Sequence, residues 1–193
     1  MNDLQTRLAK RIEDKRDDLI ALTQDLIRIP TLNPPGENYR EICTFLGERL
    51  ARSGFTMEMV RAEGAPGDST KYPRWNVVCR REGKRAGECV HFNSHIDVVE
   101  VGAGWTFDAF GGELSDDKIY GRGACDMKGG LAASIIAAEA FVEECPDYAG
   151  AIEISGTADE ESGGYGGVAY LAEKGFYDPN RVQHLRGDGK DND

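Results

Sequence analysis

The chain has 193 residues, of which 40% are hydrophobic and 30% are charged. This length suits one domain with its own core, and no apolar run approaches the roughly 20 residues that a membrane span needs. A formal net charge of −11 repels nucleic-acid phosphates. We therefore expect neither a membrane nor a nucleic-acid partner.

The N-terminal residues and the cysteines indicate the compartment. The chain begins without the basic and apolar regions of a secretory signal. Its five cysteines form no Cys-x-x-Cys pair, which suits reduced thiols better than disulfides or a zinc knuckle. A cytoplasmic protein is expected.

Two helices are predicted before the first strand. Apolar residues over 4–29 recur mainly at three- and four-residue steps, which predicts one amphipathic helix that Pro30 ends. Similar spacing predicts a second helix over 37–53, followed by Gly54. Both helices should bury one apolar face.

Strand patterns follow at 55–60, 75–80, 88–95 and 151–157, and helical patterns at 127–145 and 166–174. The strands at 75–80 and 88–95 look like a β-hairpin. The segment 100–117, rich in glycine, aspartate and aromatic residues, is predicted to be a long functional loop. Strands alternating with helices indicate an α/β fold, a mixed sheet with helices on both faces.

The pattern changes at residue 182. Residues 1–181 are predicted to form one domain, and 182–193 a polar tail in which Leu185 is the one large apolar residue after Val182. We expect either a disordered tail or a chain interrupted before its fold is complete.

A histidine and several carboxylates lie where predicted strands give way to loops. His95 and Asp97 end an apolar run, Asp126 lies in a glycine-rich segment that enters a helix, and Glu160 and Glu161 follow a buried strand. Sites in α/β folds lie beyond the carboxyl ends of strands. These residue types suit a hydrolytic metal site.

Each of these residues also has an ordinary structural interpretation. His95 and Asp97 can be a satisfied structural pair; otherwise one binds metal while the other orients it, or Asp97 orients a catalytic group. Asp126 can cap a helix or bridge two cations. Glu160 and Glu161 can be solvated acids; in extended backbone they would point to different sides, one toward a metal and one toward its water.

Three motifs together resemble the M20 metallopeptidases, the group of acetylornithine deacetylase, succinyl-diaminopimelate desuccinylase and aminoacylase. They are SHIDVV at 94–99, YGRGACDMKGG at 120–130 and TADEESG at 157–163. The resemblance runs from the first helix to about residue 178. It implies an incomplete zinc-peptidase-like catalytic domain.

The resemblance also implies a role for each site residue. His95 would bind one metal, Asp126 would bridge two, and Glu161 would bind the second. Glu160 would be the general base and Asp97 the partner that orients the site. The cofactors would be two divalent ions, zinc by preference, with cobalt or manganese as alternatives.

The implied activity is amide hydrolysis of N-acyl amino acids or similar small substrates by a metal-activated water. A dipeptidase or carboxypeptidase of the same family, or an inactive truncated fragment, are the alternatives. A complete member would form a homodimer through an inserted lid and dimerisation domain, which is absent here together with the C-terminal part.

Several family positions find a weak match or none in this chain. The resemblance calls for a further acidic ligand after Glu161, where only Asp188 and Asp191 are near, and for a late histidine. His184 is expected to be exposed instead. Trp105 matches an aromatic position of the family, although a loop tryptophan more often packs than reacts.

Overall fold

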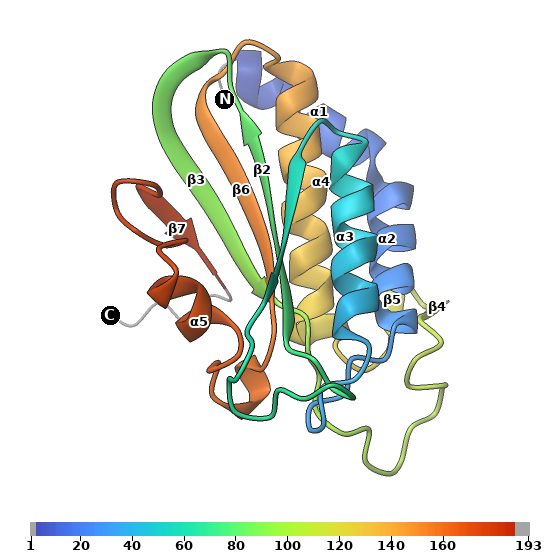
Figure 1. Cartoon of the computed structure of the whole chain (residues 1–193). Helices are drawn as coiled ribbons and strands as arrows, with labels where there is room; N and C mark the ends of the chain where they lie inside the picture. The colour runs from blue at the N-terminus through green and yellow to red at the C-terminus, as the bar shows by residue number, and fades with distance from the viewer. Residues whose placement is uncertain (1–2, 188–193) are drawn as a thin grey trace, which may run out of the picture.

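The computed structural model describes residues 3–187. One mixed sheet forms the centre of this part of the chain (Figure 1). The sheet has the order β1-β2-β6-β3-β7. Its strands are β1 (Thr56–Arg61), β2 (Trp75–Glu82), β6 (Ala149–Thr157), β3 (Arg85–His95) and β7 (His184–Arg186). Strand β2 pairs antiparallel with β1 and β6, whereas β3 pairs parallel with β6 and β7.

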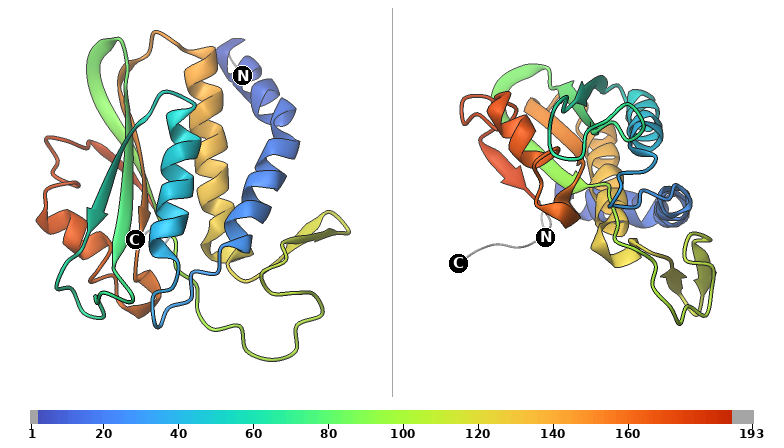
Figure 2. Two further views of the ribbon diagram at one scale, coloured as in Figure 1. Left: turned by 45° about the vertical axis from the view of Figure 1, so that its right-hand side comes forward. Right: turned by 60° about the horizontal axis from the view of Figure 1, so that its bottom comes forward.

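Helices cover both faces of this sheet, as the sequence predicted. On one face lie α1 (Asp3–Asp14), α2 (Arg16–Arg28), α3 (Tyr39–Ala51) and α4 (Gly129–Glu144), and on the other lies α5 (Val168–Glu173) (Figure 1). A small hairpin of β4 (Glu113–Ser115) and β5 (Lys118–Tyr120) forms a separate sheet, which lies away from the main sheet on the side of the helices (Figure 2). None of the helices in residues 3–187 combines the length and apolar character that crossing a membrane requires.

The main core lies between the sheet and the layer of α2, α3 and α4. Leu26, Ile42, Leu46, Ile135 and Ile154 are among its fully buried side chains. A smaller cluster beneath α5 contains Val78, Leu171 and Phe176. The predicted apolar faces therefore find partners on both sides of the sheet.

The single helix predicted over 4–29 is wrong, because the chain forms two helices that break at Lys15 (φ −97°, ψ 13°). Helix α1 buries none of its residues. Arg7 and Arg11 of α1, and Lys15 directly after it, instead form ion pairs with Glu143 and Glu144 at the end of α4. Periodic spacing predicted the helical state but not the direction of each segment.

The β-hairpin predicted from 75–80 and 88–95 is also wrong. Strand β6 lies between β2 and β3, and Gly83 donates its N–H to the carbonyl of Gly150 at 2.7 Å. Because β3, α4 and β6 form a crossover unit, the strand that follows α4 pairs parallel with β3. A short connection between two strands therefore did not make them neighbours.

The expected disorder after Val182 is wrong for 184–186, which form β7. Val90, His91 and Phe92 pair there with His184, Leu185 and Arg186. The strand is exposed, and Leu185 keeps 48% of its surface open to solvent. The tail residues from Asp188 to Asp191 lie outside the described part of the chain.

We predict that Gly150→Ala destabilises the protein more than Gly175→Ala. Both glycines have left-handed φ angles, +83° and +81°, and share a backbone cost of about 1 kcal/mol. A Cβ at Gly150 would lie 1.9 Å from the carbonyl oxygen of Glu88, whereas nothing lies within 4 Å of one at Gly175. Forced repacking should add about 1–3 kcal/mol. Urea unfolding measures the difference, and equal losses in the two variants would contradict this account.

Candidate metal centre

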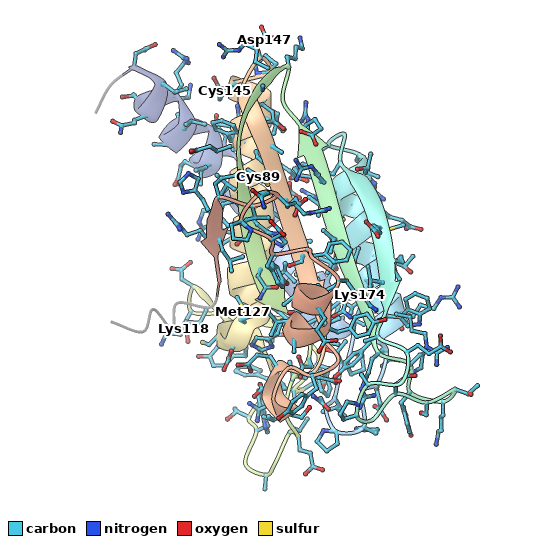
Figure 3. The ribbon with its side chains drawn as sticks, turned by 60° about the vertical axis from the view of Figure 1, so that its left-hand side comes forward. Cys89, Lys118, Met127, Cys145, Asp147 and Lys174 are labelled. Carbon is cyan, nitrogen blue, oxygen red and sulfur yellow. The ribbon has the colours of Figure 1, made fainter. Side chains whose placement is uncertain are left out.

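The candidate site forms where two neighbouring parallel strands end together. His95, the last residue of β3, is the register partner of Thr157, the last residue of β6. The segments that leave these two strands therefore start side by side. Met127, which follows Asp126, lies at this end of the molecule, opposite Asp147 (Figure 3).

Three of the predicted residues converge. The ligand atoms of His95, Asp126 and Glu161 all lie within 4.8 Å of one another. His95 Nε2 is 2.8 Å from Asp126 Oδ1; the imidazole is buried, and the Asp126 side chain is 70% exposed. One imidazole nitrogen and two carboxylate oxygens form a donor set that zinc accepts. The residues present thus fit a divalent cation.

Asp126 reaches this cluster from an irregular turn, η1 (Ala124–Lys128), ahead of α4. Asp126 has the non-helical dihedrals φ −126° and ψ 96°. The alternative role as a helix cap is wrong, because α4 begins at Gly129 after Lys128. Lys128 is fully buried and donates its Nζ to the carbonyls of Leu26 and Ile29, at 2.9 and 2.7 Å. The turn is thereby fixed to the end of α2.

Asp97 connects the ends of the two strands. Its carboxylate is fully buried and accepts the backbone N–H groups of Glu160 and Glu161, each at 3.1 Å, and the amide of Asn33 at 2.7 Å. His95 Nδ1 lies 3.0 Å from the main-chain oxygen of Asp97 and 3.6 Å from its carboxylate. Asp97 is therefore placed to orient both the imidazole and the glutamate pair.

The two glutamates lie in a 3₁₀ turn, η2 (Glu160–Ser162), and the extended backbone assumed for them is wrong. Asp159, which precedes them, has a left-handed φ of +61°. Its carboxylate accepts hydrogen bonds from Arg74 Nε and Tyr39 Oη, both at 2.9 Å. The turn keeps both acids at the site: Glu161 joins His95 and Asp126, and Glu160 lines a cavity of about 220 Å³ with His95 and Thr157.

Sequence reasoning missed Asn33, Arg74 and Tyr39, although all three hold the site in place. The sequence assigned Asn33 only to a turn-rich loop. The turn-forming composition of that loop, NPPG at 33–36, was its one distinguishing feature. Its amide also reaches Ser162 Oγ at 2.9 Å.

A larger cavity of about 640 Å³ beside α3 is lined by none of the five predicted site residues. As predicted, His184 is exposed; it contacts Glu88 instead of the site.

Burial and the neighbouring charges shift the pKa values of His95 and Glu161. Burial alone would lower the pKa of His95, but hydrogen bonds with Asp97 and Asp126 outweigh burial and raise that pKa to about 9. Burial, together with the charges of Asp126 and Asp97, raises the pKa of Glu161. Without a cation the cluster holds a proton on the imidazole, and a metal must displace that proton.

We predict that the His95 ring in the metal-free protein titrates near pH 9. Because this folded-state pKa lies above the ordinary 6.5, its stabilisation is complete below about pH 6.5 and is lost as the pH rises through 9. Asp126→Asn should lower the pKa, since it removes a charged acceptor. Asp117→Asn, at an exposed carboxylate, is the control. NMR titration measures both, and a wild-type pKa near 6.5 would refute the assignment.

Asp97→Asn should weaken metal binding and lower the free energy of unfolding by about 1–3 kcal/mol. The new amide places a donor where Asp97 now accepts three N–H groups, and it leaves buried donors unsatisfied. Asp108→Asn, in the loop after β3, serves as the control. Zinc titration with thermal unfolding tests this, and unchanged zinc affinity would show that Asp97 does not orient the site.

The sequence of this chain matches a known protein family. The family model "Peptidase family M20/M25/M40" matches residues 91–190. A succinyl-diaminopimelate desuccinylase of Cereibacter sphaeroides is 39% identical over 158 residues, which are 81% of this chain and 38% of that protein. The chain thus spans well under half the length of the curated relatives that it matches.

Solved structures share the fold. A dipeptidase of Saccharomyces cerevisiae superposes with a TM-score of 0.80 and 21% identity, covering 96% of this chain and 40% of that one. A dinuclear metal binding peptidase from the M20 family of Bacillus subtilis has a TM-score of 0.62 and 18% identity, covering 91% and 43%. Since the family model matches more than half of its residues, this chain belongs to peptidase family M20/M25/M40.

Proposed function

We propose that this chain carries the catalytic half-site of a metal-dependent amidohydrolase that acts on N-acyl amino acids or similar small amides. One observation carries the proposal: His95, Asp126 and Glu161 bring their ligand atoms within 4.8 Å at the ends of β3 and β6. Three side chains from distant parts of the sequence offer donors that suit zinc.

The proposed roles divide the site between metal ligands and a proton carrier. His95 would hold one ion, Glu161 a second, and the exposed carboxylate of Asp126 would bridge them. The support for two ions is the dinuclear metal binding of the Bacillus subtilis peptidase. A bound divalent ion makes a coordinated water more acidic and polarises an amide carbonyl.

Glu160 is the proposed general base. It lines the 220 Å³ cavity with His95 and Thr157, and its backbone N–H is held by Asp97. From there it would take a proton from the attacking water and return it to the leaving amine nitrogen. Asp97 would fix the turn that carries it.

The acyl amino acid class is favoured over peptides by the sequence relatives. The relative that is 39% identical is named a desuccinylase, whereas the dipeptidases are 20–21% identical and support the fold alone. The whole-protein activity remains a proposal, because the chain covers 38% of that relative.

We predict that Glu160→Gln and Glu161→Gln separate turnover from metal binding. Glu160→Gln should keep the bound zinc but lower amide hydrolysis by about 10²–10⁴-fold, because it removes the proton carrier. Glu161→Gln should lower zinc per chain, because it removes a ligand. Glu173→Gln, on α5, is the control.

The measurements are zinc per chain and hydrolysis of N-succinyl and N-acetyl amino acids against dipeptides. Faster hydrolysis of dipeptides would favour the peptidase alternative. Bound zinc without turnover of any of these substrates would identify an inactive fragment, and loss of zinc in Glu160→Gln would overturn the division of roles.

A further inference from the structure

A second cavity, of about 410 Å³, opens beside the metal cluster. Asp126 and Glu161 form part of its wall, and Val99, Trp105, Ile119 and Tyr120 supply apolar and aromatic surface. The lining comes from the loop after β3, from β5, from η1 and the segment that leads into it, and from η2. A group bound here would lie next to two of the three candidate ligands.

Arg122 is the one cationic side chain among the residues that line this cavity. Its Nη2 donates to the main-chain oxygens of Glu100 and Val101, at 3.0 and 3.4 Å, and its guanidinium carbon lies 5.5 Å from the ring centroid of Trp105. These contacts hold the guanidinium in place. Its Nε is buried and has no hydrogen-bond acceptor within the described residues.

A buried donor without an acceptor is uncommon, and a fixed guanidinium has a planar set of donors that matches a carboxylate. The other charged residues lining the cavity, Asp126 and Glu161, are acids that suit cations. A neutral acyl group such as acetyl has no charge for Arg122 to recognise. An acyl group that ends in a carboxylate does.

We propose that this cavity is an acyl subsite in which Arg122 binds the terminal carboxylate of a dicarboxylic acyl group such as succinyl. The inference rests on the proposed function, because it assigns the acyl specificity of that site. Trp105 forms an aromatic wall beside the guanidinium, and the candidate metal ligands Asp126 and Glu161 line the same cavity, where the reacting end of the acyl chain would lie.

Binding of succinate and butyrate to the zinc-loaded chain tests the subsite directly. The two ligands have the same number of carbons, and only succinate has a second carboxylate. Calorimetry should show succinate binding about tenfold more tightly. Arg122→Met should remove this preference, and Arg52→Met, on a surface residue outside the cavity, should retain it.

Arg122→Lys provides a second test if the methionine variant does not fold, which circular dichroism will show. Lysine keeps the charge but loses the planar pair of donors, so the preference should fall by about threefold or more. An unchanged preference in either folded variant would overturn the proposal, as would equal binding of the two ligands by the wild type.

Turnover separates this inference from the proposed function. An Arg122-dependent preference for succinate without hydrolysis would support the subsite and refute the activity. Hydrolysis with the same ratio of N-succinyl to N-acetyl turnover in wild type and Arg122→Met would support the activity and refute the subsite.

Discussion

The buried carboxylate of Asp97 is the interaction on which the candidate site depends. A carboxylate with no exposed surface needs donors around it, and Asp97 finds them in Asn33, Glu160 and Glu161. These groups come from the loop after α2 and from the turn after β6. The Asp97 carboxylate therefore joins these two segments to its own segment after β3. It also lies 3.6 Å from the imidazole of His95.

The helical layer supports the same site through Lys128. Burial lowers the pKa of this lysine to about 7, and its Nζ lies against the final carbonyls of α2. Because Lys128 directly precedes α4, this contact fixes the turn that carries Asp126. The same two helices, α2 and α4, therefore support the candidate site and supply residues to the main core against the sheet.

Charge balance connects the site with its surroundings. Asp126 and Glu161 approach one imidazole, and the raised pKa of His95 reflects the excess of negative charge there. A divalent ion balances the same excess. Arg122, which lines the neighbouring cavity, carries the opposite charge to Asp126 and Glu161 in the same lining.

The sequence by itself predicted the fold class, the strand ends that carry the candidate site, and five candidate residues, of which the structure brings the ligand atoms of His95, Asp126 and Glu161 together. Apolar period and motif spacing are local properties, so they can be recognised without coordinates. The tertiary structure decided that β6 enters between β2 and β3, that the glutamates form a 3₁₀ turn, and that Asn33 and Arg122 lie at the site. Those features depend on hydrogen bonds and packing between residues far apart in the chain, which no local pattern records.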